Sequence, residues 1–202
     1  MVEVEIKLPI KNKEIVEKSL EKLGFVKAGL VREEDAYFDN ESNHIRKNGE
    51  ALRVRKVTNL ATDESETRIT YKGKKLDQVS MTRKELETGV EDAEMCIQIL
   101  EAIGFQIIPP EVIKTRQEYT FENVTACVDQ VKNLGDFLEL EILIEEDENK
   151  ENALLQIEKV LQRLGYTRKD TTRTSYLSML QDVEDTNTTF SWGVPHFKSA
   201  ER

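Results

Sequence analysis

The chain has 202 residues, with 39 Asp and Glu against 29 Lys and Arg, so its formal net charge is −10. This length fits one domain or two small ones, and an acidic chain is not expected to bind nucleic acid through a general basic surface. No apolar run approaches the roughly 20 residues that cross a bilayer. Its two cysteines, Cys96 and Cys127, form no CxxC pattern. We expect a cytoplasmic protein with no nucleic-acid or membrane partner, no disulfide framework and no thiolate zinc site.

Alternating strands and three helices organise the chain. The helical period predicts helices over 11–23, 91–103 and 149–164, each followed by a glycine and an aromatic residue. Alternation of apolar and polar residues predicts strands near 2–8, 25–38, 50–58, 66–75, 79–88, 110–122, 124–131 and 136–145. About eight strands with few helices predict an α+β fold, in which an antiparallel sheet closes into a barrel or curves strongly.

Two features of this order concern organisation. The pairs Glu3 and Glu5, and Glu139 and Glu141, each lie on a strand that precedes a helix. This suggests either a weak internal duplication or a common arrangement of strand and helix. The sequence places one domain over 1–182 and a tail over 183–202, where the periodicity is lost. Aromatic residues in the tail, Phe190, Trp192 and Phe197, suggest that it packs on the domain or on a second subunit.

The strands carry their charges at alternate positions, so that the charges of each strand share one face. Six strands show this pattern, in the segments EVEIK, ALRVRK, TRITYKGK, TRKELE, VIKTRQEY and DFLELEILI. One interpretation is an ordinary sheet whose wet face looks outward. The other is a barrel whose charged faces line a tunnel and whose apolar faces pack outward against the three helices. The recurrence of paired charges favours the second.

A tunnel of this kind needs a ligand, because several charges lose their hydration together. Arg and Lys would bind phosphate oxygens, and carboxylates at alternate strand positions would hold Mg²⁺ or Mn²⁺, which prefer oxygen ligands. The sequence therefore indicates a polyanionic small molecule bound together with divalent cations.

The motifs resemble those of the CYTH proteins, also called triphosphate tunnel metalloenzymes. The similarity extends over roughly 1–180 and includes ExExK at 3–7, YFD at 37–39, ALRVRK at 51–56, TYKG at 70–73, TRKELE at 82–87, KTR at 114–116 and ELE at 139–141. The AYFD and GEALRVRK segments are most similar to the class IV adenylyl cyclase branch. The resemblance implies an eight-stranded antiparallel closed β-barrel with flanking helices, and a homodimer is possible.

The resemblance also implies roles for individual residues. The triphosphate would be bound by Lys7, Arg53, Arg55, Lys72, Arg83, Lys114, Arg116 and Arg173, with Lys169 as the alternative to Arg173. Metal ions would be held by Glu3, Glu5, Asp129, Glu139 and Glu141. Catalysis would involve Lys72, Glu85 and Glu87.

Two reactions fit such a tunnel. A class IV adenylyl cyclase converts ATP to cyclic AMP and pyrophosphate, whereas a triphosphatase hydrolyses thiamine triphosphate, a nucleoside triphosphate or tripolyphosphate. We expect the first, with the second as the alternative. A polyphosphate or nucleotide binder without turnover, and a plain protein-interaction domain, are the non-enzymatic alternatives. The sequence also predicts that removal of Arg55 or Lys72 leaves the unliganded protein as stable or more stable, because it relieves repulsion between cations.

Overall fold

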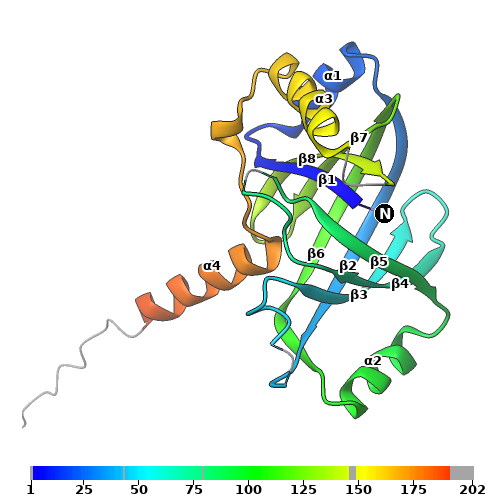
Figure 1. Ribbon diagram of the computed structural model, residues 1–202, viewed down its shortest axis with the longest axis vertical. Helices are drawn as coiled ribbons and strands as arrows, with labels where there is room; N and C mark the ends of the chain where they lie inside the picture. Colours follow the sequence, from blue (N-terminus) through cyan, green and yellow to red (C-terminus); the bar gives the residue numbers. More distant parts are fainter. Residues whose placement is uncertain (1, 43, 79, 146–148, 192–202) are drawn as a thin grey trace, which may run out of the picture.

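The computed structural model describes residues 2–42, 44–78, 80–145 and 149–191, which form a closed β-barrel with helices around it (Figure 1). The strands are β1 (Val2–Pro9), β2 (Val26–Asp39), β3 (Ala51–Asn59), β4 (Ser65–Lys72), β5 (Arg83–Val90), β6 (Gln106–Phe121), β7 (Val124–Val131) and β8 (Gly135–Ile144). The helices are α1 (Lys13–Lys22), α2 (Ala93–Ala102), α3 (Lys150–Arg163), α4 (Tyr176–Ser191) and the short 3₁₀ helix η2 (Arg168–Asp170).

The eight strands follow the order β1-β5-β4-β3-β2-β6-β7-β8 and pair antiparallel throughout. The prediction of an α+β fold with a closed eight-stranded barrel is confirmed. Closure depends on the short β1–β5 pairing, in which Glu3 lies opposite Arg83. One further hydrogen bond of 2.9 Å, from the Met81 N–H to the Glu5 carbonyl oxygen, lengthens this seam.

The helices begin and end where the sequence indicates. The side chain of Asn12 accepts a hydrogen bond from the Ile15 N–H at the start of α1, and Asp92 caps α2 in the same way. Helices α1, α2 and α3 are each followed by a glycine with φ between +85° and +96°, a conformation that only glycine adopts without strain. The chain therefore leaves each helix sharply and returns along the barrel.

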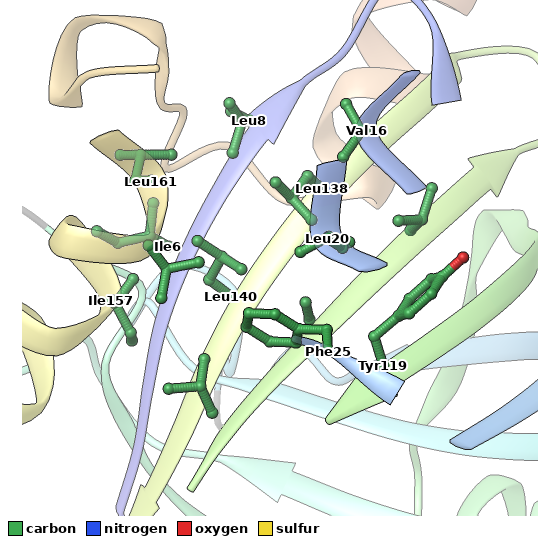
Figure 2. Close-up of a cluster of buried hydrophobic side chains, with 14 of the residues drawn as sticks. Ile6, Leu8, Val16, Leu20, Phe25, Tyr119, Leu138, Leu140, Ile157 and Leu161 are labelled. Atoms are coloured by element: carbon green, nitrogen blue, oxygen red, sulfur yellow. The ribbon is translucent and has the colours of Figure 1, made fainter. Parts of the chain in front are cut away.

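The main hydrophobic core lies outside the barrel wall, between the sheet and two helices. Figure 2 shows Ile157 and Leu161 of α3 turned toward Ile6 of β1, and Leu20 of α1 close to Leu138 of β8. The two strand–helix units considered as a duplication, β1–α1 and β8–α3, share this core. Because the apolar strand faces are used outward, the charged faces are left to line the interior.

A second cluster covers β3, where Leu100 of α2 packs on Phe38 and Val54. The prediction that apolar faces pack outward against three helices is thus confirmed.

The C-terminal helix differs from expectation. Its first turn packs on the barrel through Tyr176, Leu177 and Leu180, and the helix then projects away from the sheet (Figure 1). The loss of periodicity after residue 182 does not mark the end of this helix, because α4 continues to Ser191. Trp192 and Phe197 lie outside the described residues, and the boundary between domain and tail stays a prediction. Among the described residues, no helix is long and apolar enough to cross a membrane.

Candidate functional site

The interior of the barrel contains a cavity of about 1280 Å³. Its wall includes every sequence-predicted site residue except Asp129, and it includes neither Lys169 nor other residues of η2. The strand register explains this arrangement, since the charged positions oppose one another across neighbouring strands. Glu5 lies opposite Glu141, Lys7 opposite Glu139 and Lys72 opposite Glu85. The charged strand faces therefore converge on one enclosed space.

Three carboxylates come together on the β1–β8 part of the wall. One oxygen from each of Glu3, Glu5 and Glu141 lies within 4.8 Å of the other two. The Glu5 Oε1 atom is buried and accepts no hydrogen bond, and its ion pair with Lys7 is long, at 3.9 Å. This oxygen-rich group with an unsatisfied buried acceptor suits a hard divalent cation such as Mg²⁺ or Mn²⁺.

The electrostatics of this group agree with a missing positive charge. Burial and the nearby Glu139 raise the pKa of Glu5 from 4.5 to about 7. Burial and Glu3 likewise raise the pKa of Glu141 well above its ordinary value. Without a cation, the protein therefore favours protonated carboxyl groups at this point of the wall.

Asp129 stands apart from these three carboxylates. It is completely buried on β7, where Lys114 Nζ lies 2.6 Å from Oδ2 and Arg116 donates two hydrogen bonds of 2.7 Å. Its geometry is that of a counter-ion for the two cations. Glu139 lies between the three clustered carboxylates and Asp129, because it pairs with Arg116 and also lies 3.7 Å from Lys7. Although burial opposes its charge, Arg116 and Lys114 lower the pKa of Glu139.

Two acidic residues that are not among the sequence-predicted site residues also belong to the site. Asp35 accepts hydrogen bonds of 2.5 and 2.7 Å from Arg55, and Glu33 lies 2.8 Å from Arg55 and 3.1 Å from Lys114. Arg53 lies 3.6 Å from Asp35. Glu33 and Asp35 share a strand face at i, i+2 spacing, so the same alternation could have identified them.

The residues assigned to catalysis lie on β4 and β5. Lys72 forms an ion pair with Glu85 and lies 3.6 Å from Glu3. Although burial opposes its charge, Glu3 and Glu85 raise the pKa of Lys72, so this side chain acts as a cation and not as a base. Glu87 accepts a hydrogen bond of 2.7 Å from Thr70 and one of 3.1 Å from Arg68. These contacts hold Glu87 ionised, because they lower its pKa against the effect of burial.

Tyr176 also reaches the site. Its ring centroid lies 4.4 Å from Lys7 Nζ and 5.4 Å from Lys114 Nζ, and its hydroxyl group contacts Asp129. The charged strand motifs do not identify Tyr176 as a site residue. The contacts place it at one end of the cavity, beside the apolar residues Val112 and Phe137.

Comparison with known proteins agrees with this architecture. The family model described as the CYTH domain matches residues 1–176. A protein of Methanocaldococcus jannaschii, named a "putative adenylate cyclase", is 37% identical over 179 residues, which cover 89% of this chain and 98% of the relative.

Solved structures show the same fold. A Pyrococcus horikoshii protein is 32% identical and superposes with a TM-score of 0.81 over 90% of this chain and 99% of its own. A Hippeastrum protein described as a "putative adenylyl cyclase" with a dominant triphosphatase activity is 15% identical, with a TM-score of 0.62 over 90% of this chain and 95% of its own. The family match and the Methanocaldococcus relative show that the chain belongs to the CYTH family of triphosphate tunnel proteins.

Proposed function

We propose that this protein is a metal-dependent enzyme that converts ATP to cyclic AMP and pyrophosphate inside the barrel. The observation that carries the proposal is the group of Glu3, Glu5 and Glu141 facing a cation-lined wall in the same enclosed cavity. Carboxylates that hold a divalent cation beside Arg and Lys side chains provide the two elements that phosphoryl transfer requires, namely positioning and charge neutralisation. The name of the Methanocaldococcus relative supports the cyclase reaction.

The size and the lining of the cavity favour a nucleotide over a bare phosphate chain. Its volume of about 1280 Å³ exceeds what a drug-sized ligand commonly occupies. The end of the cavity that lies away from α4 is lined by Val31, Val57 and Leu143. Each of these residues lies two positions from a charged residue of the cavity wall on the same strand, and therefore on the same strand face. These apolar side chains offer a surface for the base and the sugar, while the phosphates occupy the charged section.

The chain's own residues would bind and orient the substrate. A bound Mg²⁺ or Mn²⁺ would neutralise phosphate charge and polarise the phosphoryl group that reacts. Lys72, which stays protonated, would contact the phosphate oxygens closest to Glu3. The 3′-hydroxyl of the ribose attacks the α-phosphorus in this reaction, and the cations Arg53 and Lys7 on the surrounding wall would stabilise the departing pyrophosphate.

Hydrolysis of a triphosphate is the second candidate. The three apolar lining residues near the open end include no aromatic ring that could stack on a base, and Leu143 is 63% exposed. The Hippeastrum structure, described as having a dominant triphosphatase activity, supplies an example of hydrolysis on the same fold. In this case water would take the place of the ribose hydroxyl and the products would include orthophosphate.

One experiment separates the candidates. The protein is incubated with ATP, thiamine triphosphate or tripolyphosphate, with Mg²⁺ or Mn²⁺, and the products are separated by chromatography. Cyclic AMP with an equal amount of pyrophosphate supports the cyclase. Orthophosphate without cyclic AMP overturns it in favour of the triphosphatase. Tight triphosphate binding with no product would reject both reactions and leave a binder. The Glu141→Gln variant serves as the control for metal-dependent turnover.

A further inference from the structure

Part of strand β5 has an open edge. Residues Glu85 to Val90 of β5 pair with β4, whereas only Arg83 and Lys84 pair with β1. In Figure 1, β5 continues past the start of β1. Among the described residues, no strand pairs with 86–89 on that side, and all four of these residues are exposed. An exposed strand edge of this kind is able to pair with an added strand.

The backbone groups that face the open edge belong to Glu87 and Gly89. In an antiparallel ladder the N–H and C=O groups of one residue point to the same side, and successive residues alternate. The Lys84 carbonyl oxygen accepts a hydrogen bond of 2.9 Å from the Gly73 N–H on the β4 side, so the even-numbered residues of β5 point toward β4. The backbone groups of Glu87 and Gly89 therefore point away from β4, and in the described ranges no hydrogen bond of these groups is found.

Two other strand edges of the barrel are covered by hydrogen bonds. On β1, the Glu5 carbonyl oxygen accepts one from the Met81 N–H. At the start of β2, before its first residue paired with β3, the Gln117 side chain donates one of 2.7 Å to the Gly29 carbonyl oxygen. Within the part of the chain that the structure describes, the β5 edge at 86–89 has no such cover.

The outer face beside this edge is apolar. Glu85 and Glu87 line the cavity, so Leu86 points outward, and it is 59% exposed. Across β4 it lies opposite Tyr71, which is opposite Leu52 of the cluster beneath α2. The charged residues in 86–92 are all acidic, namely Glu87, Glu91 and Asp92. An added strand should therefore carry an apolar side chain on its outer face and a cationic side chain near Glu87.

The C-terminal segment of this chain has that composition. In 194–198, with the sequence VPHFK, His196 and Lys198 alternate with Pro195 and Phe197. The 11 residues 192–202 contain two basic residues and one acidic residue, which gives them a formal charge of +1, whereas the rest of the chain carries −11. Both the alternation and the charge match the β5 edge.

One antiparallel register satisfies the backbone of both strands. It places Lys198 opposite Glu87 and His196 opposite Gly89. The N–H and C=O groups of Lys198 and His196 then bond to those of the open edge. Pro195, which has no N–H, takes a position whose backbone faces solvent, the place where an edge strand tolerates proline.

The same register also suits the side chains. Phe197 would lie opposite Thr88 on the outer face, within reach of Leu86 two residues along the strand. Lys198 would share the face of Glu87. A Cβ atom added to Gly89 would meet nothing within 4 Å, which leaves space for the imidazole of His196.

The segment 194–198 is too close to α4 to reach β5 of its own molecule. The strand order places β5 and β6 opposite each other, with three strands between them on either side, and α4 packs beside Val112 of β6. Gln181 of α4 still bonds to the Pro109 carbonyl oxygen, but from there to Ser191 the helix projects about 15 Å further from the barrel (Figure 1). Val194 follows Ser191 by three residues, which span about 10 Å at most.

We propose that residues 194–198 of one molecule add to the β5 edge of a second copy of this chain as an antiparallel strand, with α4 as the arm that carries them. Reciprocal exchange of the two segments closes a two-fold dimer. The contact is small, so its dissociation constant should be on the order of 10–100 µM, and at low micromolar concentrations the protein is a single chain. This contact is independent of the reaction in the barrel.

The first test is a disulfide formed in the full chain. Leu86→Cys and Ser199→Cys are opposite each other in this register, at a position without backbone hydrogen bonds, where Cβ atoms lie close together. With Cys96→Ser in the background, mild oxidation at about 100 µM protein should give a covalent dimer on a non-reducing gel. The matched control combines Ser199→Cys with Ala28→Cys, at the exposed start of β2, and should remain mostly monomeric. A disulfide within one molecule, no disulfide, or equal dimer in the control would overturn the proposal.

The second test uses the unmodified protein, so it does not depend on the folding of a variant. A fluorescent peptide with the sequence of residues 191–202 is titrated with the full chain, and its anisotropy is measured. Methylation of the Lys198 backbone nitrogen, which would bond to Glu87, should weaken binding at least about tenfold. Methylation of the Phe197 nitrogen, which would face solvent, should leave the affinity unchanged. Equal losses for the two methylated peptides, or no binding of the unmodified peptide, would overturn strand addition.

Discussion

The hydroxyl group of Tyr176, on α4, donates a hydrogen bond of 3.1 Å to Oδ2 of Asp129, on β7. Asp129 is fully buried and already neutralises Lys114 and Arg116, so the first turn of α4 is joined directly to the cation wall. The Tyr176 ring also packs edge-on against Phe137, with a centroid distance of 5.0 Å. The helix therefore closes one end of the tunnel and fixes the position of residues that would bind phosphate.

Substitution of Tyr176 separates these two contributions. Tyr176→Phe removes the hydrogen bond to Asp129 and keeps the ring, so the free energy of unfolding should fall by about 1–2 kcal/mol. Tyr176→Ala also removes a buried ring and should cost about 3–5 kcal/mol. Urea unfolding measures both values. Equal losses in the two variants would show that the ring contributes nothing and would contradict its place in the wall.

Shortening α4 tests where the domain ends. Leu177 and Leu180 are buried against the barrel, and Arg46 donates a hydrogen bond of 2.6 Å to Gln181, whereas residues 182–186 are exposed. A chain that ends at Asp182 should keep its melting temperature and its tripolyphosphate affinity. A chain that ends at Ser175 should lose more than about 3 kcal/mol of stability, since it exposes the tunnel end. A large loss of stability in the chain that ends at Asp182 would move the domain boundary toward Ser191.

Strand alternation predicted the interior of this barrel well, because it depends only on local geometry. Arg53 and Arg55, for example, need only the extended backbone of β3 to share the tunnel face. The same rule applies to Glu33 and Asp35 on β2, although none of the charged segments named from the sequence includes them.

Other features depend on the closed structure. Asp129 contacts Arg116 because β7 lies beside β6, where the two residues are opposite each other. Alternation within one strand does not predict which strands are neighbours in the barrel. Tyr176 reaches the tunnel through the docking of α4, and Lys75 through an irregular connection that Arg173 holds. Such positions are fixed by tertiary contacts and therefore could not be read from periodicity.

The ion pairs reverse one expectation from the sequence. Arg55 is not a free cation in an empty cavity, because it makes two hydrogen bonds to Asp35 and a close ion pair with Glu33. Arg55→Met leaves the buried Asp35 without its main partner and removes one of the two close partners of the buried Glu33. We expect it to lower the free energy of unfolding by about 3–5 kcal/mol, the loss typical of a broken buried pair. Denaturant titration in the absence of ligand measures the change.

The matched control is Arg68→Met on β4. Arg68 also pairs with two acidic residues, Glu66 and Glu87, but its side chain is 45% exposed, so its loss should cost less than about 1 kcal/mol. A double-mutant cycle of Arg55→Met with Asp35→Asn should show that most of the loss is shared. An unliganded Arg55→Met protein that is as stable as the original would restore the sequence-based expectation of cation repulsion.

Glu5 makes the stability of the metal-free protein depend on pH. Its pKa is raised by burial and by Glu139, from 4.5 to about 7, so the folded protein binds the proton more tightly than the unfolded chain does. The stabilisation that this bound proton gives the folded protein is therefore present at low pH and is lost as the pH rises from about 4.5 to about 7.

A divalent cation would replace the proton of Glu5, and the stabilising effect of the cation should be larger once the carboxyl group has ionised. We expect MgCl₂ or MnCl₂ to raise the melting temperature more at pH 8 than at pH 5.5. Glu5→Gln should weaken the pH dependence, to which Glu141 also contributes, and remove most of the metal effect. Equal metal-induced shifts at the two pH values in the unmodified protein would place the cation away from Glu5.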